Sequence, residues 1–420
     1  MFTNANLSFE AAPPINVVLR FFLTGALFGV ITAGMLFFHF ETLTNIYAPN
    51  TLIIVHLLSL GVVSNFLFGA LFQMLPVVAG VSIANAQIVA MRVHYTLLLG
   101  VIFLLSGFGT SSATLYLFGG IFLGFAFFYS AFVGLRELIK IKHSASSKGM
   151  LLSLSSLFLL VVFAFILLAF KSGYDVGFDY LDIKRLHFSF GLFGLFMLLL
   201  FSISFQVIEM FYVTPPYPKY YAKYVGVTLF ALLVLSIFIP SFITIAFVAI
   251  ALIALIHSTL TIKLLRAKKR AVSDVTIWLW YFAMANLMLF GLTLLEYIFF
   301  SVPITAIALF FSFFILATIL AMVFKIVPFL VWFQLNRQGY FDGPMMHEVI
   351  HPKVAKRLFY LFFASYLLFL GALFFSSLSL VASVFLFISF LWLGILIYNA
   401  WQKYLHTLKN GMKIEFPLNM

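Results

Sequence analysis

Long apolar runs, separated by short polar or charged segments, occupy almost the whole chain. A helix needs about 20 mainly apolar residues to cross a bilayer, and twelve runs reach that length. These predicted spans lie near residues 16–38, 50–80, 92–112, 113–137, 149–171, 183–213, 222–241, 242–266, 274–302, 303–335, 355–377 and 378–403. Spans 3–4, 7–8, 9–10 and 11–12 follow each other so closely that we expect tight helical hairpins. We therefore predict an all-α, polytopic fold with a single transmembrane domain, 1–420.

The composition agrees with this prediction. Only 9% of the residues are charged and 64% are hydrophobic, whereas soluble domains carry about 25% charged residues, so lipid must be the solvent. The chain has no cysteine, which excludes disulfides, thiolate metal sites, iron–sulfur clusters and covalently attached c-type haem. No basic segment precedes the first apolar run, and that run is long enough to span, so we expect no signal peptide.

Lysine and arginine positions predict the orientation, because cytoplasmic loops are enriched in these residues. If the N-terminus is cytoplasmic, 20 of the 24 basic residues fall on the cytoplasmic side or at its membrane surface. Only Lys171, Lys184 and Arg185 fall outside, and Lys325 lies within a span. Both termini are therefore expected in the cytoplasm.

A polar residue recurs in spans 2, 6 and 10, each four spans apart. Gln73, Gln206 and Lys325 occupy similar apolar surroundings at spacings of 133 and 119 residues. The simplest interpretation is three copies of a four-helix unit. Their approximate limits would be 16–137, 149–266 and 274–403.

Several segments carry a resemblance to a known family. They are His56–Gly61, Gly69–Pro76, Pro13–Pro14, Leu19–Phe22 and Lys325–Trp332. With twelve spans in three arcs, the chain resembles the haem–copper oxidase catalytic subunit, in particular a short bacterial family similar to subunit I of cytochrome c and quinol oxidases. It is more distantly similar to the NnrS family of haem- and copper-containing membrane proteins. The resemblance implies a bacterial inner-membrane protein with haem b, with copper as the alternative metal.

The oxidase ligand set is only partly present. His56 occupies the place of the low-spin haem histidine on span 2. Span 6 carries His187 alone, without the copper-ligand motif, and spans 7 and 10 contain no histidine. The oxygen-reducing binuclear centre cannot form in its usual way, so we do not expect a terminal oxidase.

His56 and His187 begin spans 2 and 6, which run in the same direction and so place both residues at one depth. A b-type haem needs two axial imidazoles at similar depth and room for a flat ring. Gly191 and Gly194 follow His187 at i+4 and i+7, where missing side chains would leave space for the ring. The alternative is that the histidines bond to neighbours and the glycines permit close helix packing.

Two cations lie just above His187, where haem propionates would point: Lys184 and Arg185. The other metal-ligand candidates are His39, which could bind copper together with Met35 one turn earlier, and His94. His257 is a further intramembrane histidine, and burying any of these residues requires a partner.

Four polar residues form a second candidate layer on the inner side of spans 2, 6 and 10: Gln73, Gln206, Glu209 and Lys325. If the helices converge, Lys325 is expected to pair with Glu209. The layer would serve either as a proton or ion path or as a structural tie between the repeats.

The string His347-Glu348-Val349-Ile350-His351 matches the zinc-protease motif H-E-x-x-H. That chemistry requires both histidines on one continuous helix. Pro352 biases His351 away from helical dihedrals, and the only later acid is Glu415. We therefore expect no metalloprotease.

The loop between spans 5 and 6 is acidic and holds Asp175, Asp179 and Asp182. It would suit a basic partner such as a soluble cytochrome, although three acids are also common in a solvated loop. Other membrane subunits are a further class of partner, and nothing indicates nucleic acid.

Two functions follow. The first is a haem-binding protein, with copper as an alternative, in redox chemistry or in the handling of a small gas such as nitric oxide or oxygen. If it is an enzyme, it is an oxidoreductase. The second is a cofactor-free transporter or assembly factor that uses the polar layer.

The basic residues predict the sidedness of the termini. A reporter that is active only in the cytoplasm, fused after Met420, should be active, and a periplasm-dependent reporter at the same site should be silent. The reverse result would move His56 and His187 to the cytoplasmic side.

Overall fold

The computed structural model describes residues 13–269, 274–300 and 302–413, and this part of the chain is helical apart from short connections. It contains no β-strand, only one isolated bridge between Tyr340 and Lys413. Twelve of its helical segments are long and apolar enough to cross a membrane. The protein is thus an all-α, multi-pass membrane protein in a lipid environment, as predicted.

Ten spans are single helices. They are α1 (Ile15–His39), α4 (Ala86–Thr110), α5 (Ala113–Leu138), α6 (Ala145–Lys171), α9 (Lys219–Phe238), α10 (Phe242–Arg266), α11 (Val275–Phe299), α12 (Ile304–Arg337), α14 (Pro352–Ala372) and α15 (Leu378–Asn410). A 3₁₀ turn, Phe40–Thr44, extends α1, and the one-turn helix α13 (Met346–Val349) lies outside the spans.

Spans 2 and 6 are composite, because each contains a stretch of π-helix. Span 2 consists of α2 (Pro49–His56), the first π segment (Leu57–Val63) and α3 (Ser64–Ala79). Span 6 consists of α7 (Tyr180–Ser189), the second π segment (Phe190–Met197) and α8 (Leu198–Tyr212). The apolar pattern predicted both spans but not this change of helix type.

Local chemistry explains where several helices begin. Pro49 and Pro352 stand in the first turns of α2 and α14, where the missing N–H is no loss. Ser144 caps α6 through its side chain, and Asp179 and Asp274 cap α7 and α11 in the same way. The four short connections predicted from the sequence are also present, since only two to five residues separate the helices of each pair.

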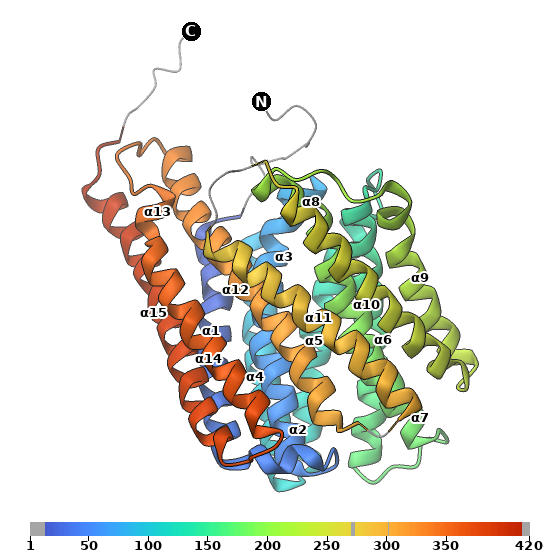
Figure 1. Cartoon of the computed structure of the whole chain (residues 1–420). Helices are drawn as coiled ribbons and strands as arrows, with labels where there is room; N and C mark the ends of the chain where they lie inside the picture. Colours follow the sequence, from blue (N-terminus) through green and yellow to red (C-terminus); the bar gives the residue numbers. More distant parts are fainter. Residues whose placement is uncertain (1–12, 270–273, 301, 414–420) are drawn as a thin grey trace.

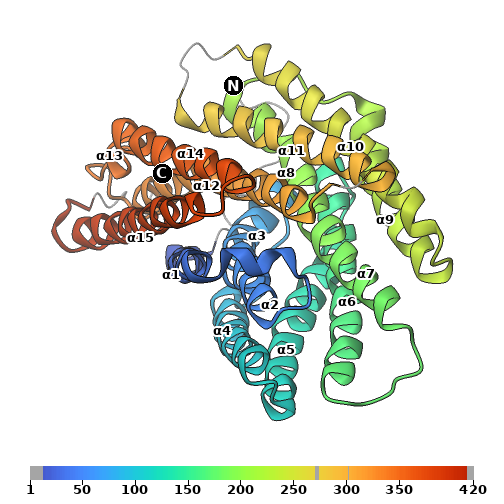
Figure 2. The same ribbon diagram turned by 60° about the horizontal axis from the view of Figure 1, so that its bottom comes forward.

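The twelve spans do not share the interior equally. In their most apolar windows, span 6 is 89% buried, span 10 is 72% buried and span 2 is 61% buried, whereas the other nine range from 28% to 56%. In Figure 2, α3, α8 and α12 lie toward the middle of the bundle and α5, α6, α9 and α15 lie around it. Every fourth span from span 2 onward is therefore central.

The bundle closes on itself, because α1 packs along α15. Twelve is an even number of spans, so α1 begins on the same side on which α15 ends, at the top of Figure 1. We call this side the terminal side and the other the far side. The starts of α2 and α7 lie on the far side.

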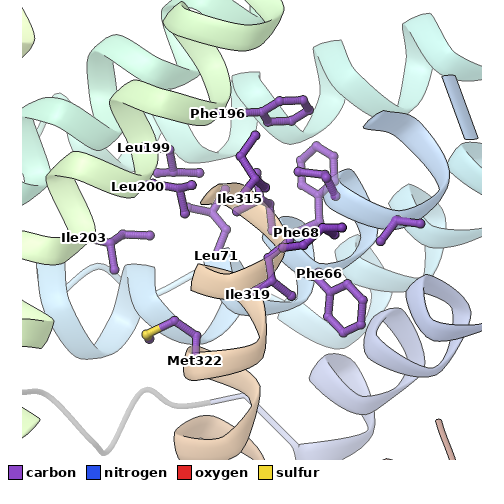
Figure 3. Packing of buried hydrophobic residues seen from close by; sticks show 14 of the residues in the cluster. Phe66, Phe68, Leu71, Phe196, Leu199, Leu200, Ile203, Ile315, Ile319 and Met322 are labelled. Atoms are coloured by element: carbon purple, nitrogen blue, oxygen red, sulfur yellow. The ribbon is translucent and has the colours of Figure 1, made fainter. Parts of the chain in front are cut away.

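The centre of the bundle is an apolar core in which α3, α8, α12 and the second π segment meet (Figure 3). Phe68 and Leu71 of α3 face Leu199 of α8 and Ile319 of α12, and all four side chains are buried. This core separates the polar groups on the far side from those on the terminal side.

Glycines allow the closest helix approaches, which is a common device in membranes. A Cβ atom added to Gly29 of α1 would lie 2.3 Å from ring atoms of Phe390 on α15. Gly34, on the same helix, has no atom within 4 Å of such a Cβ. The contact between the first and last spans therefore depends on Gly29.

Gly29→Ala should lower the free energy of unfolding by about 1–3 kcal/mol, because the new methyl group overpacks against Phe390. Gly34→Ala is the matched control and should leave stability unchanged or slightly raised. Denaturant titration in mixed micelles measures both. Equal effects of the two changes would contradict the assigned contact between α1 and α15.

Candidate functional site

His56 ends α2 on the far side and is held in one orientation. Its Nδ1 lies 2.8 Å from the backbone carbonyl oxygen of Leu52, one turn earlier. A carbonyl can only accept, so Nδ1 carries the proton and Nε2 has a free lone pair. Metal-binding histidines are often oriented by a hydrogen bond of this kind. The ring also packs 5.0 Å from that of Phe108 on α4.

His187 of α7 brings a second imidazole to the same place. The two rings have centroids 6.4 Å apart and planes inclined by 21°. The Nδ1 of His187 is buried without a hydrogen-bond partner, and the Leu160 backbone lies close to this imidazole. No hydrogen bond reaches either Nε2 within the described part of the chain, so both are available as ligands.

The spacing suits one metal atom between two imidazoles. Two metal–nitrogen bonds of about 2 Å each, together with half the width of each ring, span about 6 Å. Groups of three or more histidine, aspartate or glutamate ligands are absent from the described residues. The ligand set at this place therefore consists of the two imidazoles.

The two histidines share an unusual backbone setting, because a π segment follows each of them within three residues. π-helical stretches occur frequently at functional sites. Their freed carbonyl groups need partners in lipid, and side chains supply some of these. Ser64 donates to Ser59 O at 2.9 Å, Asn65 donates to Gly61 O at 2.8 Å, and Ser153 of α6 donates to Leu195 O at 2.9 Å.

Lys184 is the more interesting of the two predicted cations. It lies one turn before His187, and its ammonium group sits 3.8 Å from the centroid of the Tyr47 ring, just before α2. Its Nζ is buried and has no hydrogen-bond partner. Arg185, in contrast, is exposed and forms an ion pair with Asp182 at 3.1 Å. An ammonium group buried without a partner favours an anionic ligand beside it.

Gly191 and Gly194 lie next to neighbouring helices. A Cβ on Gly191 would be 3.4 Å from a methyl carbon of Leu160 on α6, and a Cβ on Gly194 would be 2.7 Å from the Ser156 hydroxyl. Their positions support the helix-packing interpretation and not the interpretation that they clear a face for a ring. The i+4 and i+7 argument assumed α-helical turns, whereas both glycines belong to the wider second π segment.

The other predicted histidines lie elsewhere. His39 ends α1 on the far side, and its Nδ1 is 3.1 Å from the side-chain amide of Asn50. His257 on α10 is buried between Ser204 and Tyr221, which contact its two ring nitrogens at 3.3 and 3.0 Å. Its ring stacks on Phe201 with centroids 3.7 Å apart, so His257 is fully occupied by structural contacts.

His94 lies near the start of α4 on the terminal side. It is 7% exposed, and its Nε2 is 2.8 Å from the Thr24 hydroxyl of α1. His94 is thus far from the His56–His187 pair, with the apolar core between them.

The H-E-x-x-H string does not form one helix. Glu348 lies in the single turn of α13, where its carboxylate accepts the Met345 N–H, and His351 is the N-cap of α14, with Nδ1 accepting the Lys353 N–H. The helix is interrupted between the two histidines, at residues 350 and 351. The segment therefore lacks the continuous helix that the protease motif requires.

The acidic loop is tied to its own backbone. Asp175 accepts the Gly177 N–H, and Asp179 accepts the Asp182 N–H as the cap of α7. These bonds use two of the three carboxylates of the loop within the loop itself.

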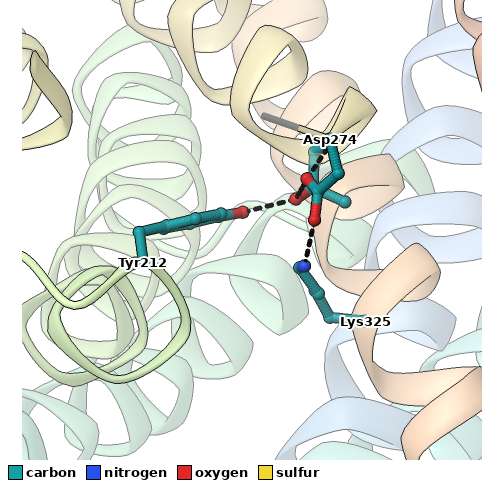
Figure 4. A network of polar contacts seen from close by, with 4 residues as sticks. Tyr212, Asp274 and Lys325 are labelled. Carbon is teal, nitrogen blue, oxygen red and sulfur yellow. Dashed lines mark hydrogen bonds and ion pairs between the residues drawn. The ribbon is translucent and has the colours of Figure 1, made fainter. Parts of the chain in front are cut away.

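The predicted polar layer is assembled differently from our expectation. Lys325 pairs with Asp274, not with Glu209, at a distance of 2.5 Å between Nζ and Oδ2 (Figure 4). Thr276 donates its hydroxyl to the same carboxylate, and Tyr212 at the end of α8 donates to Thr276 at 2.7 Å. The network ties spans 6, 9 and 10 together near the terminal side.

The remaining members of that layer are not in the network. Glu209 is exposed and Gln206 is half-buried, while Gln73 is buried with both amide atoms unpaired. The prediction missed Asp274, although it is the single acid between Glu209 and Glu296 and precedes a threonine at a helix start. The predicted layer included only polar residues of spans 2, 6 and 10, whereas Asp274 lies at the start of span 9.

No family model matches this chain, and none of the curated proteins compared with it matches. The evidence on function therefore comes from the chain's own residues.

The Lys325–Asp274 pair should contribute to stability. Burial raises the pKa of the Asp274 carboxyl, but hydrogen bonds from Lys325 and Thr276 outweigh it and hold the pKa below its ordinary value. Asp274→Asn would leave the Lys325 ammonium uncompensated, at an expected cost of about 1–3 kcal/mol for this partly exposed pair. The double change Asp274→Asn with Lys325→Met should recover most of that loss.

Low pH should destabilise the protein by protonating the Asp274 carboxylate. Because the pKa of Asp274 is lower in the folded protein, the stabilisation is present above the ordinary aspartate pKa of about 4 and is lost as the pH falls through the lowered value. Denaturant titrations between pH 7 and 3 should show this loss in the wild type and less of it in the double variant. Glu209→Gln is the control and should leave the free energy of unfolding unchanged. A loss of stability as large as that of Asp274→Asn would support the predicted pairing of Lys325 with Glu209.

Proposed function

We propose that this protein is a haem-binding membrane protein in which His56 and His187 are the axial ligands of one b-type haem. The observation that carries the proposal is the convergence of these two imidazoles from spans 2 and 6, with ring centroids 6.4 Å apart. Both Nε2 atoms are available, and Nδ1 of His56 donates to a backbone carbonyl. Bis-imidazole ligation is an established arrangement for an iron atom in a membrane bundle.

Lys184 supports haem over a bare metal ion. Its buried ammonium group has no hydrogen-bond partner, lies one turn from His187 and touches Tyr47 next to α2. A propionate carboxylate would neutralise it, whereas a metal cation would add to the local positive charge. Copper held by the same two imidazoles is the alternative. Arg185 takes no part in this arrangement, because Asp182 already neutralises it.

A haem held here would supply one-electron chemistry at its iron, which suits electron transfer or the handling of a small gas such as nitric oxide or oxygen. The Leu52 carbonyl orients the His56 imidazole, and the apolar core next to the pair would exclude water. Lys184 would neutralise a propionate. The residues of an oxidase-type binuclear centre are lacking, since spans 7 and 10 contain no histidine. An enzymatic activity, if present, would be that of an oxidoreductase.

The orientation of the protein in the membrane is part of the same proposal. The positive-inside rule and the family resemblance favour a bacterial inner membrane with both termini in the cytoplasm. The His56–His187 pair would then lie near the periplasmic surface, where a soluble electron carrier could reach it.

The rival function is a cofactor-free transporter or assembly factor. The ion pair of Lys325 and Asp274 with the unpaired Gln73 amide is the feature that favours it. The packed apolar side chains at the centre of α3, α8 and α12 (Figure 3) weigh against it, because a polar pathway would have to open through them.

The purified protein should show a Soret band and a reduced-minus-oxidised spectrum of b type, with about one iron per chain. His56→Ala and His187→Ala should each remove more than nine tenths of the haem or convert it from low-spin to high-spin, because one of two axial ligands is lost. Lys184→Gln should weaken haem retention about tenfold through loss of a charge-assisted contact. His39→Ala and His94→Ala are the controls and should keep the wild-type spectrum.

Three outcomes would contradict the proposal. Full haem retention in the His187→Ala variant would exclude His187 as an axial ligand. Copper without iron, lost in the same two variants, would assign the pair to copper. A wild-type protein purified from iron-replete cells with neither metal would favour the transporter.

A further inference from the structure

A second polar site lies on the terminal side, between α1 and α4. Asn16, Arg20 and Thr24 follow each other at intervals of four residues and share one face of α1, and His94 of α4 meets this face at Thr24. His94 is 7% exposed. Three polar atoms here are buried without a partner: Asn16 Oδ1, Arg20 Nη1 and His94 Nδ1.

The hydrogen bonds of Thr24 favour one tautomer of His94. The Thr24 hydroxyl lies 3.1 Å from the backbone carbonyl of Arg20, to which it can only donate. Its single proton is then used, so it accepts from Nε2 of His94 at 2.8 Å. His94 Nδ1 therefore carries a lone pair, and it acts as an acceptor that lacks a donor.

Arg20 is the second reason to expect a ligand, because no carboxylate of the described residues pairs with its charge. A bound water could donate to His94 Nδ1 and Asn16 Oδ1, but it would leave the guanidinium charge uncompensated in a membrane setting. The site requires a molecule that combines an anionic group with at least one hydrogen-bond donor.

The site opens toward the membrane surface. The guanidinium carbon of Arg20 lies 5.8 Å from the centroid of the Tyr95 ring, and Tyr95 is 54% exposed. Arg92 is exposed one turn before Tyr95. Arg20 is the sixth residue of α1, about 8 Å along the helix from its start. The 25 residues of α1 exceed the hydrocarbon thickness by about 4 Å at each end, so the Arg20 backbone lies just inside the hydrocarbon boundary and its long side chain can reach the headgroup region.

We propose that Arg20, His94 and Asn16 bind the headgroup of one phospholipid on the terminal side. The phosphate would receive the Arg20 guanidinium, which matches phosphate oxygens in geometry and charge. The ammonium of ethanolamine or a hydroxyl of glycerol would donate to His94 Nδ1 and Asn16 Oδ1. Phosphatidylcholine has the phosphate but no such donor. The site is independent of the His56–His187 pair.

Native mass spectrometry of the protein released from vesicles of one phospholipid tests this inference. The wild type should retain one phosphatidylethanolamine or phosphatidylglycerol about ten times more often than one phosphatidylcholine. Arg20→Gln should abolish retention of all three lipids, because the phosphate contact is lost. His94→Phe should lower the first two to the level of phosphatidylcholine and leave phosphatidylcholine unchanged.

Arg266→Gln is the matched control, since Arg266 is an exposed arginine that ends α10 on the same side. It should retain lipid as the wild type does. If Arg20→Gln does not fold, Arg20→Lys replaces it and should reduce retention in part, because an ammonium keeps the charge but not the two-pronged geometry.

The inference is overturned if the wild type does not distinguish the headgroups, or if Arg20→Gln, or Arg20→Lys in its place, retains as much lipid as Arg266→Gln. Displacement of the lipid by millimolar inorganic phosphate would assign the site to a soluble anion and would also overturn it.

Discussion

Lipid offers no hydrogen bonds, and this single constraint organises the polar groups of the protein. Every polar side chain within the bundle needs a partner from the chain itself or from a bound molecule. His257, Tyr212 and Thr276 find partners in neighbouring helices. His187, Lys184, Arg20 and His94 each keep a buried atom without one. The unpaired atoms of these four residues lie at two places on opposite sides of the membrane, and these are the two places to which we assign ligands.

Much of the fold could be predicted because membrane spans are local features of sequence. Twenty apolar residues indicate a span wherever they occur, and short polar breaks indicate the hairpins. Spans 2, 6 and 10, which share a polar residue, are also the three most buried spans. The proximity of His56 and His187 followed from equal depth on two central spans. Each of these inferences uses only position along a helix and depth in the membrane.

Pairings between distant segments could not be predicted in this way. Lys325 had an acid at a suitable depth in Glu209, but which acid lies nearest depends on how helices rotate about their axes. The structure turns Lys325 toward Asp274 in the connection before α11. The argument that placed Gly191 and Gly194 on the face of His187 counted α-helical turns, and that count does not apply where the helix is π-helical. Rotation about the helix axis is the quantity that this sequence left undetermined.

The two π segments have a consequence for how such a pair of histidines arises. A π segment accommodates one residue more than the α-helical ladder would hold, so it corresponds to a single inserted codon. Losing that residue from Leu57–Val63 would rotate α2 by about 100° relative to α3. The His56 side chain would then point in another direction, while the rest of span 2 kept its packing. The same holds for His187 and Phe190–Met197. A pair of imidazoles between two central helices can therefore appear or disappear through changes in length alone, without replacing any residue of the apolar core.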